Sequence, residues 1–391
     1  MSNLNPQGYI QKWGGKIGGH LYLRDMGGFE EFLPNADVLS PDQTFNDIKH
    51  KNRYLTSSIT NWKFISGIPV IVRGSHPNDH EGLVDVIKTV KNVFTPEGIE
   101  NAINDIKLNA SFPLVKSYAE DFEGQPYDGK IRIMIADQLL NKNFLDAVHV
   151  DRGSIIEHPH QRNTYLIELI PPNLTPIAAF ERAVVRDDEI IHYIDDGDEK
   201  TLSDDSATMF KNGDYKQLID LYQLVQFSEF IPSDTSFQME FGYTTTPEKG
   251  KAKVQFFQAM PFKKFEEPPY FLGDHDKSNY TCFGITPPEG LVLPLRTTSN
   301  SIDDEEVDIS EPYALIIYKN TRSRSLSFQP KNMFAYLAVG ARASSFEHNH
   351  YRWIKKAQVS ITDNLQTGME KDTKKIRIIS NGINSIVESV D

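Results

Sequence analysis

The sequence predicts an α/β protein that is built from two domains. Segments in which apolar and polar residues alternate, the period of a β-strand, recur along the chain and include the pair 236–244 and 254–262. Other segments have apolar residues every three or four positions, the period of a helix, as in 215–227. A run rich in charge and proline at 263–275 separates residues 1–262 from residues 276–391. The chain of 391 residues therefore divides into two domains joined by a linker.

The composition describes an acidic globular protein. Hydrophobic residues make up 39% of the chain and aromatic residues 11%, which is enough for a packed core. The net charge of −13 argues against a nucleic-acid partner, because nucleic-acid binding usually needs a basic surface. Cys282 is the only cysteine, so no internal disulfide can form and a reducing compartment fits. The sequence shows no signal peptide and no apolar run of about 20 residues, so we expect a cytoplasmic protein without a membrane partner.

The first candidate site is the segment 13–28, WGGKIGGHLYLRDMGG, in which glycines flank Lys16 on both sides. Glycine lets the backbone approach a phosphate group closely, and a lysine beside it supplies a mobile positive charge. The segment lacks the G-K-[ST] sequence of a P-loop. Two interpretations stay open, a phosphate-binding segment and a flexible loop with a surface lysine.

A second candidate site lies at the end of a short buried strand predicted over 68–72. Arg73 follows this strand and precedes a polar turn that contains His76. An arginine in such a place can bind an anion through its planar guanidinium group. The alternative is a strand-end arginine in a surface ion pair. The histidine is predicted to belong to a polar loop, because no set of four metal ligands accompanies it.

The middle of the chain alternates between the two periods. Helical spacing covers 83–107, where Thr95 and Pro96 mark the start of a helix. Strand patterns follow at 130–140, 147–151 and 164–170, with a turn predicted around Gly153 between the last two. The acidic stretch 187–205 is predicted to be a loop.

The two alternating segments 236–244 and 254–262 are joined by a polar insert with proline and glycine, which predicts a β-hairpin. Glu240 on one strand and Gln258 on the other carry side-chain oxygens in apolar surroundings. Neighbouring strands lie about 5 Å apart, so the two oxygens can meet on one face and bind a hard cation such as Mg²⁺. The alternative is a plain hairpin with an exposed glutamate and an exposed glutamine.

These segments resemble, in their order, the ATP-binding domain of phosphoenolpyruvate synthase and pyruvate phosphate dikinase. The run that begins GGK is similar to that family's G-G-K-x-x-x-L opening, and VRGS is similar to its V-R-S-S. The hairpin sequences QMEF and QAMP resemble the family's D-I-E-W and Q-A-R-P. The resemblance implies an ATP-grasp-like fold in which Lys16 and Arg73 contact the nucleotide. It also implies that Glu240 and Gln258 bind the nucleotide and its Mg²⁺ ion.

Several positions depart from the family's pattern. Met260 stands where the family has an arginine that contacts phosphate, and a thioether cannot replace a guanidinium group. The glycine-rich phosphate loop after Arg73 is shortened, and the segment 170–180 replaces the family's G-L-G-E loop. Where the family has a glutamine on the adenine side, the alignment leaves Asp137 and Gln138 as alternatives.

The pattern of residues 276–391 resembles the swivelling phosphohistidine domain of the same family. A buried strand is predicted at 313–318, and a hairpin at 376–387 turns at Asn381 and Gly382. The sequence GARASSFEHNH is similar to the family's G-G-x-x-S-H, which implies His348 as the phosphoryl carrier and His350 as the second choice. A neutral imidazole is a nucleophile near pH 7. The alternative is a solvent-facing histidine before a helix.

Taken together, the resemblance implies an ATP-dependent phosphotransferase that uses ATP and Mg²⁺. An ATP-grasp-like nucleotide-binding domain would occupy 1–262, and a small α/β swivelling domain would occupy 276–391. The phosphoryl group would pass through His348 to an unknown acceptor or partner protein. The alternative, which Met260 and the shortened loop favour, is a catalytically degenerate nucleotide-binding or protein-interaction protein.

Overall fold

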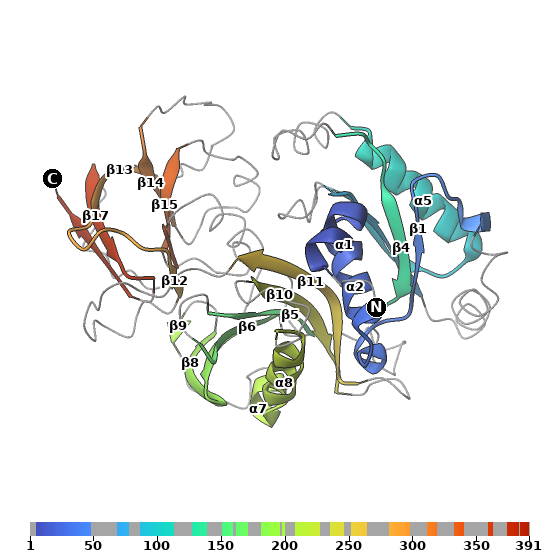
Figure 1. The fold of residues 1–391 in the computed structure, drawn as a ribbon, viewed down its shortest axis with the longest axis horizontal. Helices are drawn as coiled ribbons and strands as arrows, with labels where there is room; N and C mark the ends of the chain where they lie inside the picture. The colour runs from blue at the N-terminus through green and yellow to red at the C-terminus, as the bar shows by residue number, and fades with distance from the viewer. Residues whose placement is uncertain are drawn as a thin grey trace. The chain divides into compact units, whose positions relative to one another are not determined.

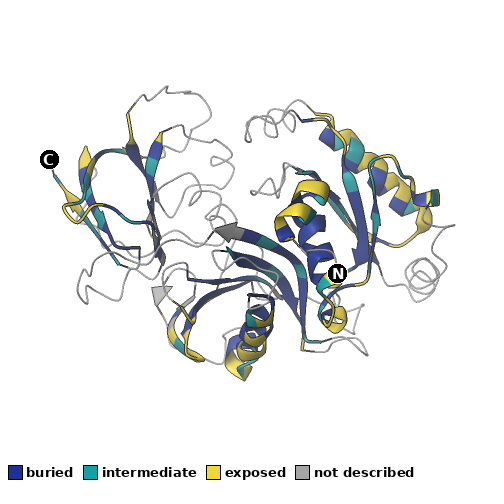
Figure 2. Ribbon diagram, viewed as in Figure 1, coloured by how far each residue is buried: buried dark blue, intermediate teal, exposed yellow. Residues whose placement is uncertain are grey.

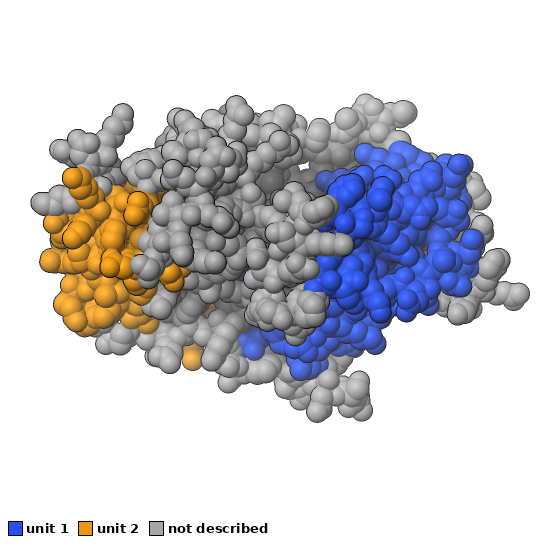
Figure 3. All heavy atoms as spheres, turned by 90° about the horizontal axis from the view of Figure 1, so that it is seen from above, with its two compact units in different colours: residues 1–156, 171–173, 212–262 blue, residues 157–170, 174–211, 263–391 orange. Residues whose placement is uncertain are grey.

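The computed structural model shows a mixed α/β protein that divides into two compact units. The first unit contains 1–156, 171–173 and 212–262, and the second contains 157–170, 174–211 and 263–391 (Figure 3). The predicted domain 1–262 therefore differs from the first unit, because residues 157–170 and 174–211 belong to the second. The residues that the structure describes are 5–47, 69–77, 87–112, 127–138, 151–158, 162–170, 181–195, 198–199, 208–226, 235–245, 252–263, 281–297, 311–318, 332–339, 359–362, 374–382 and 384–390.

The first unit contains a four-stranded antiparallel sheet in the order β1-β4-β2-β3 (Figure 1). Its strands are β1 (Ala36–Leu39), β4 (Arg132–Asp137), β2 (Val70–Ser75) and β3 (Thr89–Val93). Helix α5 (Pro96–Ala110) covers one face, and its isoleucines pack on the buried side chains of β2 and β4. Figure 2 shows the exposed residues of α5 on the side that faces away from this sheet.

The start of α5 is confirmed as the sequence predicted it. Thr95 Oγ1 accepts a hydrogen bond from the Gly98 amide at 3.0 Å, and Pro96 stands at the first helical position. This arrangement satisfies one backbone donor that a helix start would leave open, and proline loses nothing there because its amide carries no hydrogen. The helical pattern predicted for 83–90 is wrong at its end, since Thr89 and Lys91 belong to strand β3.

Helices α1 (Pro6–Trp13) and α2 (Gly15–Met26) lie on the other face of this sheet. A short 3-10 turn, η1 (Glu30–Phe32), follows them. The flexible loop that stayed open as one of two interpretations of 13–28 is wrong, because 15–26 form a helix. Three glycines in the first five positions of α2 each lower helical propensity by roughly 1 kcal/mol, but Gly18 and Gly19 allow close packing against other backbone.

A second group of strands in the first unit runs in the order β11-β10-β5. Its members are β5 (Asp151–Glu157), β10 (Thr235–Tyr243) and β11 (Val254–Lys263). The hairpin of β10 and β11 is confirmed, and the turn predicted around Gly153 is wrong because this residue lies inside β5. Helix α8 (Tyr215–Gln226) is also confirmed, and its Tyr222 hydroxyl donates to the Phe237 carbonyl at 2.7 Å.

The second unit contains an antiparallel series in the order β6-β7-β8-β9. Its strands are β6 (Thr164–Ile170), β7 (Glu181–Arg186), β8 (Glu189–Asp195) and β9 (Asp198–Glu199). The short helix α7 (Thr208–Asn212) follows. The loop predicted for 187–205 is wrong over 189–195, which form β8 after a two-residue turn at Asp187 and Asp188 with φ of 49° and 65°. Residues 196–197 and 200–205 lie outside the described residues. The acidic composition masked the alternation Ile-Ile-His-Tyr-Ile.

A seven-stranded sheet in the second unit has the order β12-β16-β15-β14-β13-β17-β18. Its strands are β12 (Thr281–Phe283), β16 (Val359–Thr362), β15 (Met333–Val339), β14 (Tyr313–Tyr318), β13 (Leu291–Thr297), β17 (Lys375–Ser380) and β18 (Ser385–Ser389). A single bridge from Ile285 to Asn381 also joins the chain after β12 to the chain after β17. The predicted strand 313–318 and the hairpin at Asn381 and Gly382 are confirmed.

Candidate functional site

Helix α2 is the element that positions the candidate site, since it lies between two groups of strands of the first unit (Figure 1). On one side, Ile17 and Leu21 pack against Met134 of β4. On the opposite side, the Tyr22 ring stacks on Phe237 of β10 with 5.8 Å between ring centroids and 12° between ring planes. A helix held on two sides in this way is fixed in its rotation.

Two glycines allow α2 to pack more closely on α1 and β11 than any residue with a side chain would permit. A Cβ added to Gly19 would stand 2.2 Å from the carbonyl oxygen of Ala259 in β11. A Cβ added to Gly18 would stand 2.7 Å from the carbonyl oxygen of Tyr9 in α1. Both distances are shorter than non-bonded atoms tolerate, so these two glycines are required by packing.

Lys16 lies in the first turn of α2 and is almost completely buried, with 2% of its surface exposed. Its Nζ atom donates a hydrogen bond to the Ile87 carbonyl oxygen at 3.4 Å. The surface lysine that the sequence left open as an alternative is therefore wrong. Burial of a lysine disfavours its charge unless acceptors or anions surround it, so this position is unusual for a purely structural residue.

Arg73 lies on the same side of the four-stranded sheet as α2. It pairs directly opposite Met134 of β4, and side chains of paired residues point to one face. Met134 packs against α2, so the Arg73 side chain is on the α2 face as well. The structure therefore brings two predicted cationic residues, Lys16 and Arg73, to the same face of this sheet.

The N-terminus of α2 abuts the end of β2. Gly14 precedes the helix with φ of 81°, a conformation that favours glycine. A Cβ added there would stand 2.3 Å from Ser75 Oγ and 2.3 Å from the His76 carbonyl oxygen. Ser75 is fully buried, and among the residues that the structure describes its hydroxyl has no hydrogen-bond partner. No local sequence pattern predicts this contact, because it joins positions about 60 residues apart.

Glu240 and Gln258 lie on neighbouring strands of the first unit. Glu240 is half-buried in β10 and pairs opposite Ser154 of β5. Gln258 in β11 is completely buried, and neither its amide nitrogen nor its amide oxygen has a partner among the described residues. A buried amide with both ends unsatisfied is rare in proteins and calls for an explanation such as a bound ligand or water.

The register of β10 with β11 determines whether one ion can bind both Glu240 and Gln258. The Thr244 amide donates to the Lys253 carbonyl at 2.9 Å. If this register continues without a bulge, Gln258 pairs with Met239 and Glu240 pairs with Phe257, on opposite faces of the sheet. A shared Mg²⁺ ion then requires a one-residue bulge along the hairpin. Among the described residues, no group of three or more histidine, cysteine, aspartate or glutamate side chains is arranged to hold a metal.

The two alternatives for the adenine side differ in their surroundings. Asp137 ends β4 opposite Val70, so it lies on the face of α5 and away from Arg73. Its Oδ2 accepts a hydrogen bond from Asn35 Nδ2 at 2.8 Å. Gln138 exchanges two hydrogen bonds of 2.7 and 2.8 Å with Asn92 beyond β3. Neither residue is joined to Lys16 or Arg73 by a described contact.

Of the remaining predicted positions, the described residues include Met260 and exclude both candidate carrier histidines. Met260 is half-buried in β11, where the resemblance places a phosphate-binding arginine. His348 and His350 lie outside the described residues, as does most of the predicted linker 263–275. The carrier role of His348 therefore stays a prediction.

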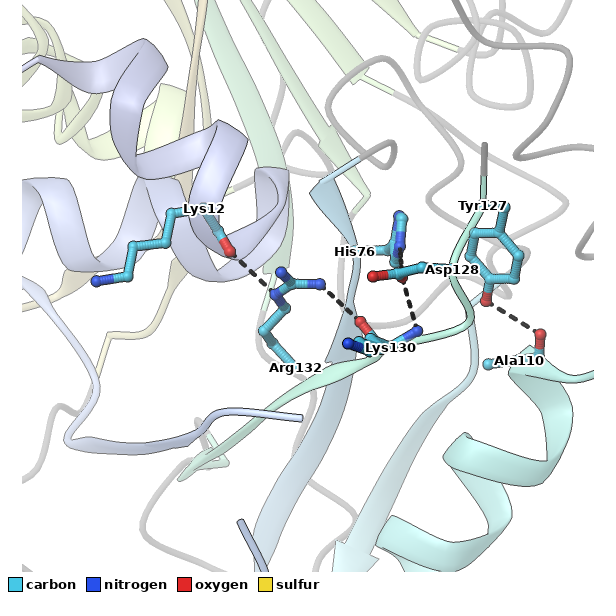
Figure 4. A network of polar contacts seen from close by, with 7 residues as sticks. All are labelled: Lys12, His76, Ala110, Tyr127, Asp128, Lys130 and Arg132. Atoms are coloured by element: carbon cyan, nitrogen blue, oxygen red, sulfur yellow. Dashed lines mark hydrogen bonds and ion pairs between the residues drawn. The ribbon is translucent and has the colours of Figure 1, made fainter. Parts of the chain in front are cut away.

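His76 lies directly after β2 and outside any strand, as predicted. It is nevertheless buried, and its Nε2 lies 2.8 Å from Asp128 Oδ1 (Figure 4). Burial lowers the pKa of this imidazole, against the opposing influence of the Asp128 carboxylate. The hydrogen bond from His76 and the Lys130 amide in turn hold the pKa of Asp128 below its usual value, despite partial burial. The turn sequence Tyr-Asp-Gly was the available signal, since Gly129 has φ of 68°.

Comparisons with known proteins give little beyond this geometry. No protein-family model matches the chain, and no curated protein sequence matches it. A structure of C-terminally truncated Cdc123 from Schizosaccharomyces pombe is 13% identical, with 60% of this chain and 79% of that chain covered and a TM-score of 0.27. A structure of Cdc123 from the same organism is also 13% identical, with coverage of 62% and 84% and a TM-score of 0.26.

Similarity of this extent assigns neither a family nor the role of a residue. Within the described part of the chain, no helix is long and apolar enough to cross a membrane. The structure by itself shows a mixed α/β protein with several antiparallel strand pairings, in which a buried lysine of the glycine-rich helix α2 and an arginine of β2 lie on the same face of one sheet.

Proposed function

We propose that the first unit binds ATP and that the chain is an ATP-dependent phosphotransferase of the phosphoenolpyruvate synthase and pyruvate phosphate dikinase type. The observation that supports this most is the burial of Lys16 in the first turn of α2, on the sheet face that also carries Arg73. A helix start offers free amide groups and a partial positive charge, both of which favour phosphate. Two added cations make this face suitable for a polyphosphate.

The chemistry of this proposal needs little from the protein beyond position and charge. Lys16 and Arg73 would hold the phosphate oxygens, and Arg73 would do so with a forked pair of donors. A nitrogen of His348 would then form a bond to phosphorus while the bond from phosphorus to the departing nucleotide oxygen breaks. The phosphohistidine would pass its phosphoryl group to an acceptor bound elsewhere on the chain or on a partner protein.

Magnesium belongs to the proposal as the ion that accompanies ATP. Mg²⁺ usually binds through one or two carboxylates together with phosphate oxygens and waters. The half-buried Glu240 and the unsatisfied amide of Gln258 suit such an ion chemically, and one ion can bind both only if the hairpin carries a bulge. We therefore propose Glu240 and Gln258 as metal and nucleotide ligands without deriving a step from the ion.

A second function, a catalytically degenerate nucleotide-binding or protein-interaction protein, is supported by Met260, which stands two positions after Gln258 in β11. Met260 is half-buried there and can donate no hydrogen bond to phosphate. The family's chemistry relies on an arginine at that place, so binding without phosphoryl transfer is the expected result if Met260 is decisive. The enzyme and the degenerate nucleotide-binding protein both bind ATP and differ in phosphoryl transfer, whereas a protein-interaction protein needs neither.

ATP binding is tested by calorimetry on the full chain with Mg²⁺ and ATP. Lys16→Met keeps the length of the side chain and removes its charge, and we expect an affinity loss of about 10- to 100-fold, the value of a charge-assisted hydrogen bond. Lys12→Met is the matched control, because Lys12 is an exposed lysine at the end of α1. Absence of any binding by the wild-type chain contradicts the enzyme and the nucleotide-binding protein, and leaves the protein-interaction protein.

Phosphoryl transfer is tested by incubation with γ-labelled or β-labelled ATP. The enzyme proposal predicts label on the protein that acid removes and base preserves, as for phosphohistidine. His348→Asn should abolish this label and leave ATP binding intact, and His350→Asn should leave both unchanged. Binding without label, even in the presence of cell extract as a source of acceptor, supports the degenerate protein.

A further inference from the structure

The N-terminus of α2 is covered in the structure, although the proposed function needs it to meet phosphate. The five residues from Gly14 to Gly18 are all buried, and so are Ser75 and His76, which abut Gly14. Lys16 Nζ is directed to the Ile87 carbonyl at 3.4 Å. A phosphate group can reach these amides only if a neighbouring segment moves.

The covering contact is held by one short segment, residues 127–132, which we call the clasp. Asp128 Oδ1 lies 2.8 Å from His76 Nε2 and also accepts the Lys130 amide at 2.9 Å (Figure 4). The Tyr127 ring packs on the His76 ring with 4.6 Å between centroids. The Tyr127 hydroxyl donates to the Ala110 carbonyl at 3.0 Å, which anchors the clasp to the end of α5.

The other end of the clasp binds the helix pair itself. Arg132 Nε donates to the Lys12 carbonyl at 2.9 Å, two residues before Gly14, and its Nη1 donates to the Lys130 carbonyl at 2.7 Å. One segment thus holds the end of β2 through His76 and the junction of α1 and α2 through Lys12. Figure 4 shows both attachments on the same stretch of chain.

An independent observation indicates that the covered place is built for a ligand. Ser75 is fully buried against Gly14, and its hydroxyl has no hydrogen-bond partner among the described residues. A buried hydroxyl without a partner is a destabilising feature that proteins seldom retain without a function. Beside helix amides and a buried lysine, the group that would satisfy it is an anionic oxygen such as that of a phosphate.

We propose that the clasp keeps the phosphate-binding N-terminus of α2 closed in the free chain, and that release of the His76–Asp128 contact opens it. This inference rests on the proposed function for its ligand but not for its geometry. Because only the open state binds, the apparent affinity for ATP is reduced by the small fraction of open molecules. Breaking the clasp should therefore strengthen binding, whereas damage to an ordinary site weakens it.

The test uses the full chain and the variant Asp128→Ala, which removes the acceptor for His76 at a side chain that is 48% exposed. The first readout is hydrogen exchange in a peptide that covers residues 13–19, where the Gly18 amide donates to the Gly14 carbonyl at 2.7 Å. We expect exchange there to be about tenfold faster than in the wild type, the effect of one lost charge-assisted contact. A peptide from β17 should not change. The second readout is calorimetry with Mg²⁺ and ATP, in which affinity should rise by about tenfold.

The matched control is Asp105→Ala, since Asp105 pairs with Lys88 at 3.0 Å on the exposed surface of α5. Exchange at 13–19 that is unchanged in Asp128→Ala, as in this control, overturns the clasp. Faster exchange combined with weaker ATP binding overturns it too, because the segment would then be a support of the site. Faster exchange with no ATP binding by any variant keeps the clasp and rejects the proposed function. His76→Phe, which preserves the ring and loses Nε2, must reproduce the result of Asp128→Ala.

Discussion

Two fully buried serines end two strands in different units, and their surroundings are opposite. Ser380, the last residue of β17, donates to the Gly284 carbonyl at 2.6 Å, lies 3.0 Å from Cys282 Sγ and receives the Gly382 amide at 3.3 Å. Ser75, the last residue of β2, has a hydroxyl without a partner among the described residues. The two hydroxyls are equally buried, but that of Ser380 has hydrogen-bond partners and that of Ser75 has none among the described residues.

The contrast separates polar groups that hold a fold together from those kept for another purpose. The hydroxyl of Ser380 joins chain segments almost 100 residues apart, and its backbone amide is also bonded, to Thr286 Oγ1 at 3.0 Å. Around α2, by contrast, Ser75, Tyr22 and Gln258 all carry buried polar atoms without a partner in the described structure. Stability alone does not explain such a cluster, so function is the better explanation for the first unit.

The largest effect should come from disturbing the tight packing that surrounds the unsatisfied cluster. Gly19→Ala places a methyl group 2.2 Å from a backbone oxygen of β11, which cannot move aside as a flexible side chain does. We expect the free energy of unfolding to fall by about 3 kcal/mol or more. Urea unfolding followed by circular dichroism measures it.

Gly8→Ala is the control for that substitution, because Gly8 lies in the exposed part of α1 with nothing closer than 3.8 Å to an added Cβ. Its replacement should stabilise the protein by about 0.5–1 kcal/mol through reduced chain entropy. Equal effects at both glycines contradict the close approach of α2 to β11.

The second largest effect is expected at a buried carboxyl group, that of Asp37. Burial raises the pKa of Asp37 to about 6, and the nearby charge of Asp137 adds to this. Since the folded pKa exceeds the unfolded one, the folded state binds the proton more tightly, and the resulting stability is lost as pH rises through about 6. Asp37→Asn should therefore stabilise the chain by about 2–3 kcal/mol at pH 8 and by little at pH 4. Unfolding free energies of both proteins across this range decide it, and a constant difference contradicts the assignment.

The third effect concerns the satisfied serine. Ser380→Ala leaves the Gly284 carbonyl and the Gly382 amide without this hydroxyl, which should destabilise the second unit by about 2 kcal/mol. The only cysteine, Cys282, reports it, since burial raises the pKa of its thiol to about 11 and keeps it unreactive. Its reaction with a thiol reagent should become about 30-fold faster. Ser389→Ala, at an exposed position of β18, should not alter that rate.

The smallest effect on stability is expected at the unsatisfied serine. Ser75→Ala removes a buried hydroxyl that lacks a described partner, so the free energy of unfolding should rise by about 1 kcal/mol. The same variant should weaken ATP binding about fivefold, the value of one neutral hydrogen bond. A large loss of stability without a loss of affinity would make Ser75 an ordinary structural residue like Ser380.

Local patterns predicted much of the fold. The cap at Thr95, the hairpin at Asn381 and Gly382, and the strand 313–318 were all recognised, because the signals are contiguous in sequence. Helix α2 was missed because its glycines are required for close contacts with Tyr9 and Ala259. Tertiary packing outweighs intrinsic helix propensity in this segment.

The candidate site was predictable only in part, and for the same reason. Lys16 and Arg73 were chosen for their chemistry, and the register of β2 with β4 places them on one face. The covering of α2 by Ser75 and the role of Asp128 depend on which distant residues fold against Gly14 and His76. No periodicity in the sequence encodes such pairings. The proposed carrier, His348, lies outside the described residues and stays a prediction.

The bridge between Ile285 and Asn381 has a consequence for the order of folding. It joins segments that flank β12 and β17, and the Cys282–Ser380 contact beside it spans 98 positions. During synthesis β12 and β13 emerge long before β17. Until β17 is made, the backbone groups on the β17 side of β13 have no partner strand. Contacts between residues far apart in sequence form slowly, because the entropy of closing the loop is lost before the contacts contribute favourable energy. The edge of β13 should therefore stay open until the end of the chain has been synthesised, and the β13–β17 pairing should be a late step in folding of the second unit.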